Sequence, residues 1–286
     1  MLRIEILRSR FAERTAELLT PSGEPDLFAA EVVDRPGLAA LIVSATPDVA
    51  ADVVLDAVAE AAGRLIRERV LPFAKVVAGQ SRPPSPKAVL RDHDPAHPVS
   101  AERLLHRLRT ALREFDDGSW TYDHIGSTSV PDLRAKPFVD LQLGVRPLPG
   151  EGSAVDEALH ALGFVPARGA RPDSPGVYRD QIKDPALAPE DDYRKRLYVR
   201  ADPGLPAILH VRKLGSPWWS YSVLFRDWLR TDTAGRRAYE AAKERAAAAH
   251  ADDPDYDDYT RTKAAFFAKV QRDYERAGAD SAYRLR

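Results

Sequence analysis

The chain has 286 residues, of which 44% are hydrophobic and 30% charged, so it can bury a core, and wholesale disorder is excluded. Its 42 Lys and Arg residues balance 43 Asp and Glu residues, which excludes a dominant polyanion-binding surface. The absence of cysteine excludes disulfides, thiolate metal sites and cysteine nucleophiles.

Residues 1–78 predict a small α/β unit. Residues 2–7 (LRIEIL) have the alternation of a strand, and 38–43 form a short apolar run between turn residues. Apolar residues at helical spacing predict a helix over 49–70. The segment 79–87 is rich in proline and lacks apolar periodicity, so we predict a stiff linker there.

Residues 88–286 predict a mixed sheet followed by a helical tail. Ser100 is a plausible N-cap for an amphipathic helix of regularly spaced leucines. Strands are predicted at 120–125, 138–145, 163–165, 196–200 and 207–212, and helices at 154–162, 219–230, 233–250 and 256–277. The expected fold class is α+β: a mixed sheet with flanking helices and a helical C-terminal tail, preceded by a small α/β appendage.

The sharpest motif is HIGSTSVPDLRAKPFVDLQLGV at 124–145. A predicted strand ends at Ile125, and the Gly-Ser turn after it offers hydroxyl and backbone N–H groups of the kind that bind phosphate. Asp140 follows inside an apolar strand, where a carboxylate is costly to bury unless a cation compensates its charge. The residues alone leave two interpretations open: Asp140 binds a metal ion, or it pairs with a nearby arginine.

A Gly-Ser loop followed about a dozen residues later by a strand Asp resembles the signature of the polymerase-β-like nucleotidyltransferase superfamily. The resemblance implies that the turn holds a triphosphate and that two carboxylates at alternate strand positions coordinate metal ions. Here the second position is Gln142, whose amide oxygen can ligate Mg²⁺ but contributes no charge. Two-metal phosphoryl transfer would therefore lack one of its carboxylates.

The whole motif is similar to the hallmark of the GrpB-type family, a branch of that superfamily. Three further segments agree in order: DHDPAHP at 92–98, ILHVR at 208–212 and LFRDWLR at 224–230. The resemblance covers roughly residues 88–278. Members of this family usually lack the second carboxylate too, so Gln142 fits the family, and the resemblance implies a fold more than a reaction.

The segment RLYVRADPGLP at 196–206 is similar to the C-terminal domain of actinobacterial two-domain dephospho-CoA kinases, where a GrpB-type domain follows a P-loop kinase. MLRI at the start, LIVSATP at 41–47 and LIRERVLPFAKVVA at 65–78 resemble fragments of such a kinase. The N-terminal part is therefore interpreted as a truncated kinase-like appendage. A kinase needs a glycine-rich loop after its first strand, but this chain has EILRSR there, so dephospho-CoA kinase activity is not expected.

The candidate site residues follow from these resemblances and from their neighbours. Asp140 is expected to be catalytic and to hold the metal together with Gln142. His210 is expected to be a third ligand or a base, with a satisfied core histidine as the alternative. The residues expected to bind the nucleotide are His124, Gly126, Ser127, Thr128, Lys136, Arg196 and Arg212.

Four of these residues, His124, Lys136, Arg196 and Arg212, also have a structural interpretation. His124 binds phosphate or only fixes the loop, and Lys136 meets a phosphate or extends to water. Arg196 and Arg212 either bind phosphate or place positive charge on an edge strand, which prevents it from pairing with another chain.

The expected function is transfer of a nucleotidyl or phosphoryl group from ATP or another nucleoside triphosphate to a small-molecule acceptor, with Mg²⁺ or Mn²⁺. The alternative is a non-catalytic domain that binds a nucleotide or phosphometabolite, or that stabilises a partner chain. Gln142 favours this alternative, whereas the intact Gly-Ser loop and Asp140 favour an enzyme.

We expect a cytoplasmic protein with no membrane or nucleic-acid partner. No run approaches about 18 apolar residues, and the N-terminus MLRIEILRSR is too charged for a secretory signal. The acceptor, the nucleotide and the oligomeric state are left open by the sequence.

Overall fold

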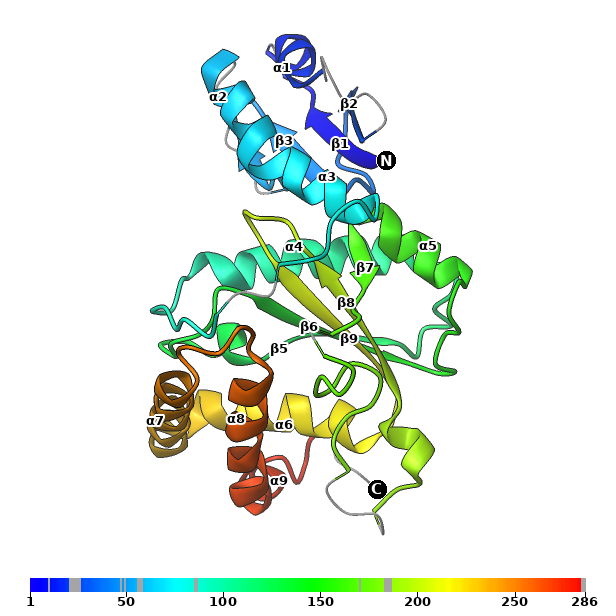
Figure 1. Ribbon diagram of the computed structural model, residues 1–286. Helices are drawn as coiled ribbons and strands as arrows, with labels where there is room; N and C mark the ends of the chain where they lie inside the picture. Colours follow the sequence, from blue (N-terminus) through cyan, green and yellow to red (C-terminus); the bar gives the residue numbers. More distant parts are fainter. Residues whose placement is uncertain are drawn as a thin grey trace.

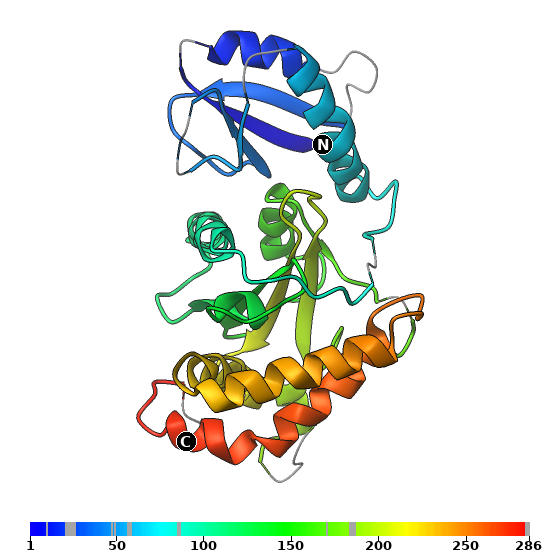
Figure 2. The same cartoon turned by 90° about the vertical axis from the view of Figure 1, so that its left-hand side faces the viewer.

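The computed structural model describes residues 1–9, 11–20, 27–46, 48, 50–55, 59–84, 87–169, 171–182 and 187–283. Within these residues the chain builds a 4-stranded sheet and a 5-stranded sheet, each with its own hydrophobic cluster. Figures 1 and 2 show the smaller, N-terminal unit stacked on one end of the larger body. The interior of the predicted linker, at 85 and 86, lies outside the described residues.

The N-terminal unit is a parallel sheet with helices. Its strands are β1 (Leu2–Leu7), β2 (Phe28–Val33), β3 (Leu41–Ser44) and β4 (Val53–Val54), in the order β2-β1-β3-β4. Its helical segments are α1 (Ala12–Leu19), α2 (Ala59–Leu65), a π-helical stretch (Ile66–Val70) and α3 (Leu71–Val77). Pro72 is the second residue after the π-helical stretch, and the missing N–H of proline accounts for a break in the regular hydrogen-bond pattern there.

The larger sheet has the order β5-β6-β9-β8-β7. Its strands are β5 (Thr121–Ile125), β6 (Val139–Val145), β7 (Phe164–Pro166), β8 (Lys195–Arg200) and β9 (Ala207–Lys213). The central strands β6 and β9 are parallel, and the other pairs are antiparallel. The mixed α+β arrangement predicted from the sequence is therefore confirmed.

The two faces of this sheet differ in chemistry. Leu141 and Leu209 are fully buried on one face, under α4 (Ala96–Ala111) and α5 (Ala154–Ala161). The alternate positions of β6 and β9 are polar: Asp140, Gln142, His210 and Arg212. Because strand side chains alternate, these four share the opposite face, on the side of the C-terminal helices (Figure 1).

Those helices are α6 (Pro217–Thr231), α7 (Thr233–Ala249), α8 (Asp257–Lys269) and α9 (Gln271–Ala277). They pack around an aromatic cluster that includes Phe225, Trp228, Tyr239 and Tyr274. The loop after β5 joins this cluster through Val130. The helical tail is therefore anchored against the same loop that carries the Gly-Ser motif.

Charged hydrogen bonds tie the N-terminal unit to the larger body. Arg200 is fully buried and donates to Asp202 Oδ2 at 2.7 Å and to the backbone oxygen of Ala40 at 2.5 Å. Arg69 donates to both carboxylate oxygens of Asp202, at 2.6 and 2.8 Å. The β8–β9 turn is thus bonded to the first sheet and to the helical stretch beside it.

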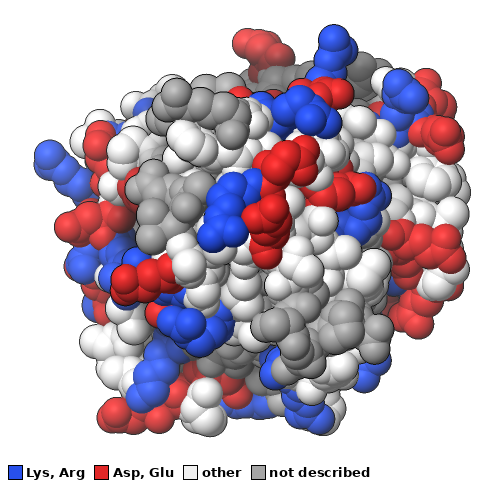
Figure 3. Space-filling model, turned by 90° about the horizontal axis from the view of Figure 1, so that it is seen from above, with Lys and Arg blue, Asp and Glu red and all other residues white. Residues whose placement is uncertain are grey.

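The surface of the N-terminal unit carries mixed charge. Figure 3 shows Lys and Arg side chains intermixed with Asp, Glu and uncharged residues on this face. No described helix is both long and apolar enough to span a bilayer.

Candidate functional site

The turn after β5 lies directly against the Asp140 carboxylate. β5 and β6 are antiparallel with Ile125 opposite Asp140, so Gly126 follows at the end of the strand pair. Gly126 has a positive φ of 72°, and a Cβ on it would clash with the carboxylate of Asp140. Glycine is therefore required here for two reasons, backbone conformation and space. The Gly-Ser turn and Asp140 form one site.

His210 faces Asp140 from β9. Its Nε2 lies 3.9 Å from Asp140 Oδ1, while Nδ1 lies 3.1 Å from Lys195 Nζ and 3.2 Å from Arg212 Nη2. Because an ammonium and a guanidinium can only donate, Nδ1 must accept, and this network assigns the ring proton to Nε2. Burial and these two cations lower the pKa of His210 well below its usual value. The neutral ring thus donates toward Asp140, which argues against the base or metal-ligand role predicted for it.

Gln142 lies beneath the site and is fully buried. Its Oε1 accepts a hydrogen bond from Arg212 Nη1 at 2.6 Å, and its Nε2 donates to the backbone oxygen of Trp219 at 3.0 Å. Arg212 also forms a bidentate pair with Asp180, at 2.7 and 3.1 Å. A guanidinium on the amide oxygen repels a metal ion, so this arrangement argues against the metal-ligand role predicted for Gln142.

Two lysines lie against one tyrosine ring beside Asp140. Lys136 Nζ is 4.0 Å from the ring centre of Tyr256 and 5.3 Å from that of Tyr259. Lys263 Nζ is 5.5 Å from the same Tyr259 ring. Aromatic faces attract cations, but they do not neutralise them. Across the described ranges, no carboxylate forms an ion pair with either lysine.

The electrostatics of the site reflect crowded positive charge. Burial, with the charge of Lys263, lowers the pKa of Lys136 to about 7. Burial lowers the pKa of Lys195 to about 8 although Asp180 attracts it, with Nζ 2.9 Å from Oδ1. Burial raises the pKa of Asp140, whose side chain is 31% exposed, against the opposing pull of Lys263 and Lys136.

Lys243 on α7 holds the Gly-Ser turn from the other side. It is 1% exposed and donates to the backbone oxygen of Arg134 and, at 3.3 Å, to Ser127 Oγ. Burial, with the charge of Lys263, lowers the pKa of Lys243 to about 7. The C-terminal helices therefore contribute directly to the loop that the sequence motif identifies.

The sequence carried a signal for these lysines that the motif analysis missed. The pattern Tyr-x-x-x-Lys occurs twice in the tail, as Tyr239 with Lys243 and as Tyr259 with Lys263. Residues four apart share one helix face, and each lysine lies over its tyrosine, at 5.0 and 5.5 Å. The repeated Tyr–Lys pair on α7 and α8 indicates that both helices present a lysine to the same site, beside the Gly-Ser turn and Asp140.

The remaining predicted residues lie elsewhere. His124 Nε2 and Thr128 Oγ1 are 3.0 Å apart, and burial lowers the pKa of His124 to about 3, so this pair fixes the loop. Arg196 points to the opposite face of the sheet and bonds Asp156 at 2.9 Å, because its neighbour Lys195 takes the face of Asp140. Arg196 therefore lies on the other face of the sheet from Asp140, and its phosphate-binding role stays a prediction.

The side chains present do not fit a resident Mg²⁺. In proteins this ion is bound by one or two carboxylates together with waters and substrate phosphates, and Asp140 is the only carboxylate of the two motif positions. Over the residues that the structure describes, no group of three or more His, Asp or Glu side chains could hold a metal. Lys136, Lys263 and Arg212 instead surround Asp140 with cations. Ammonium and guanidinium groups suit the oxygens of a phosphate.

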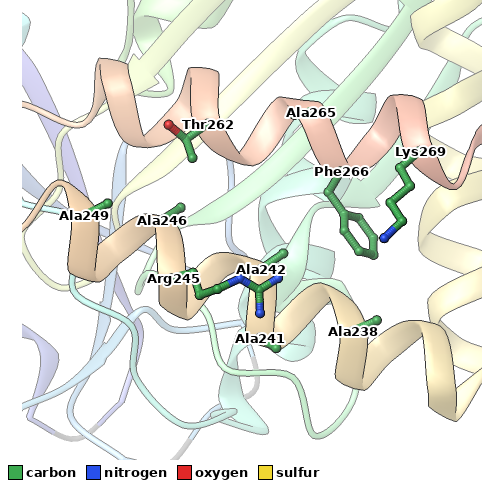
Figure 4. A pocket seen from close by; sticks show the side chains of 10 residues that line it. All are labelled: Ala238, Ala241, Ala242, Arg245, Ala246, Ala249, Thr262, Ala265, Phe266 and Lys269. Atoms are coloured by element: carbon green, nitrogen blue, oxygen red, sulfur yellow. The ribbon is translucent and has the colours of Figure 1, made fainter.

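A groove between α7 and α8 is separate from this site. It is lined mainly by alanines, with Phe266 and Lys269 at one end (Figure 4). None of the residues around Asp140 lines it. Lys269 thus belongs to the same helix as Lys263 but faces a different part of the surface.

Comparisons with known proteins place the chain in a family. A family model described as "GrpB protein" matches residues 87–273. A "Dephospho-CoA kinase" from Mycolicibacterium paratuberculosis is 33% identical over 214 residues, covering 72% of this chain and 50% of that protein. A UPF0157 protein from Halalkalibacterium halodurans is 28% identical over 173 residues, covering 60% of this chain and 76% of that protein.

A solved structure is also similar. The crystal structure of the conserved protein GrpB from Enterococcus faecalis matches with a TM-score of 0.46 and 22% identity, over 65% of this chain and 96% of that one. This chain spans about half the length of the curated dephospho-CoA kinases it matches. Since the family match covers most of the chain, from the segment before α4 into α9, the protein belongs to the GrpB family.

Proposed function

We propose that the GrpB-type part of this chain binds a small phosphorylated molecule, a nucleotide or a phosphometabolite. The phosphate lies between the Gly-Ser turn and the ammonium groups of Lys136 and Lys263. The observation that carries the proposal is this lysine pair, held on one tyrosine ring without a carboxylate ion pair in the described chain. Like charges held together disfavour the empty state, and an anion between them removes the repulsion.

The other groups of the site have complementary roles in this proposal. The Nε2–H of His210 donates to a phosphate oxygen, as does the hydroxyl of Ser127. Asp140 faces a hydroxyl or amino group of the ligand, because a carboxylate beside a phosphate would repel it. The ligand is therefore a phosphate ester that also carries a hydrogen-bond donor.

Group transfer is the second candidate, and the Gly126–Asp140 contact favours it. The nucleotidyltransferase signature places a phosphate-binding turn beside a strand carboxylate, and this chain has that juxtaposition. Transfer of a nucleotidyl or phosphoryl group from ATP to a small acceptor, with Mg²⁺ or Mn²⁺, stays a prediction. Release of pyrophosphate or ADP from ATP by the purified protein, abolished by Asp140→Asn, would support it.

The binding proposal is tested by thermal shift with matched probe pairs: ATP and adenosine, and dephospho-CoA and pantetheine. Dephospho-CoA is chosen because some relatives are named dephospho-CoA kinases. A ligand at a hundredfold excess over its Kd stabilises the folded state by about 2.7 kcal/mol. We expect the phosphorylated member of at least one pair to raise Tm and its partner not to. If no phosphorylated probe raises Tm, with or without Mg²⁺, the proposal fails.

A further inference from the structure

Besides Lys195, which is paired with Asp180, three positive groups lie near Asp140, where a metal-dependent site has metal ions between the protein and the phosphate. Arg212 lies on the Gln142 side, with Nη1 2.6 Å from the amide oxygen at the second motif position. Lys136 and Lys263 lie on the side of the Tyr259 ring. In metal-dependent transfer, divalent ions supply the charge that neutralises the phosphate oxygens. Here fixed side chains supply it.

The three cations differ in how far they are already neutralised. Arg212 is bonded to both oxygens of Asp180, which it shares with Lys195, so its charge is partly compensated. Lys136 and Lys263 contact aromatic rings, and no described carboxylate forms an ion pair with either. Among the described residues, the cations near Asp140 that have no paired carboxylate are therefore these two ammonium groups, one from the motif loop and one from α8.

We infer that Lys136 and Lys263 replace the divalent cation, so that the site binds its phosphorylated ligand without a metal ion. This inference rests on the proposed phosphate binding and adds that lysines, rather than a metal ion, neutralise the phosphate charge. It predicts that Mg²⁺ weakens binding, because Mg²⁺ neutralises the free phosphate and competes with the lysines for its oxygens. At a metal-dependent site, Mg²⁺ would instead strengthen binding.

The test is calorimetric titration of the full chain with inorganic pyrophosphate, and with ATP as a second probe, in EDTA and in excess Mg²⁺. The variants are Lys263→Gln and, as a matched control on the same helix, Lys269→Gln. We expect wild-type protein to bind in EDTA and to bind at least tenfold more weakly in Mg²⁺. Lys263→Gln should lose at least tenfold in affinity, and Lys269→Gln should stay within twofold of wild type.

A second measurement guards against a folding defect. Because Lys263 is repelled by Lys136 in the empty protein, Lys263→Gln should leave the Tm of the ligand-free protein unchanged or raised. A lowered Tm would mean that Lys263 has a structural role and would count against the inference.

The possible failures are distinguishable. Binding that appears only with Mg²⁺ overturns the metal-free mode but leaves phosphate binding standing. Equal binding by wild type and Lys263→Gln also overturns the lysine role. If neither probe binds wild-type protein in EDTA or in Mg²⁺, and the thermal-shift panel is negative too, the proposed function itself fails.

Discussion

At Gly126 the backbone and the Asp140 carboxylate compete for the same space, and this makes a residue-scale prediction. Gly126→Ala should lower the free energy of unfolding by about 2–4 kcal/mol, since the strain of a positive φ adds to a steric clash. Gly118 is the matched control: its φ is 89°, and nothing lies within 4 Å of a Cβ placed there. Gly118→Ala should cost only the backbone strain, about 1 kcal/mol, in urea denaturation. Equal losses would show that the Asp140 contact is absent.

Asp140 itself is predicted to be dispensable for stability. Burial raises the pKa of its carboxyl, so the ionised form is less favourable in the folded than in the unfolded chain, and its contribution falls as pH rises through the shifted pKa. Asp140→Asn should therefore leave the Tm of the ligand-free protein at neutral pH unchanged or raised. A structural ion pair behaves oppositely and typically costs about 3–5 kcal/mol when one partner is removed. A large loss of Tm would identify Asp140 as the structural partner of the lysines.

The titration of Lys136 predicts a pH dependence of phosphate binding. The groups around it are Lys263 and Asp257 on α8, the Tyr256 ring, and Asp140 on β6. With a pKa of about 7, Lys136 is charged below that pH and increasingly neutral above it, whereas binding needs the charged form. Affinity for ATP should therefore fall between pH 7 and 9, by up to about tenfold per pH unit.

Lys136→Arg is the control for this pH series, because a guanidinium stays protonated throughout the range. The variant should bind with a flatter pH profile, measured with the same probe so that the titration of ATP itself cancels. Parallel profiles for wild type and variant would assign the pH dependence to another group.

At the scale of elements, the larger sheet was predictable and the N-terminal unit was less so. All five strands near the motif alternate apolar and polar residues or form short apolar runs between turns, and each was found within two residues of its expected bounds. The helix predicted over 49–70 was wrong at its start, since β4 pairs with β3 there and α2 begins at Ala59. Pairing with a neighbouring strand overrode the helical spacing.

Three local features escaped the sequence for other reasons. α1 and β2 were not predicted, although turn residues at 20–26 (TPSGEPD) separate them in the sequence. α4 begins at Ala96, so Ser100 lies inside the helix and is not its cap. Pro98 is accommodated there because the first turn of a helix needs no N–H donor.

The residues of the site differ in how far apart they lie in the sequence, and only the neighbouring ones could be predicted. Gly126, Ser127, Lys136 and Asp140 belong to one contiguous motif, and the structure brings them together. Lys243 joins them from 116 residues beyond Ser127. The sequence does not show which face of a C-terminal helix packs against the sheet. The contact of Lys243 with Ser127 could therefore be found only in the structure. Only the repeated Tyr–Lys pairs pointed to it.

For the whole molecule, Asp202 is predicted to be the residue on which the attachment of the N-terminal unit depends. Asp202→Ala leaves Arg69 and Arg200 without their shared carboxylate and should lower the free energy of unfolding by about 3–5 kcal/mol. Asp191→Ala, at a largely exposed pair, should change the free energy of unfolding little.

The same ion pairs give this attachment a pH dependence. Burial works to raise the pKa of Asp202, but the charges and hydrogen bonds of Arg200 and Arg69 prevail and lower it. The wild-type contribution is therefore complete at neutral pH and is lost as pH falls below the usual range of aspartate. Urea denaturation at pH 7 and pH 3 should show a smaller gap between wild type and Asp202→Ala at the lower pH.

The β8–β9 hairpin has a consequence for communication along the molecule. Lys195 starts β8 beside His210, and Arg200 ends it at the backbone of Ala40, a distance of about 17 Å along one strand. One strand thus carries Lys195, on the Asp140 face of the sheet, at one end and a hydrogen bond to the N-terminal unit at the other. A ligand that fixes Lys195 should slow amide hydrogen exchange in β3, far from any atom it touches, and Arg200→Met should uncouple that protection while the ligand still binds.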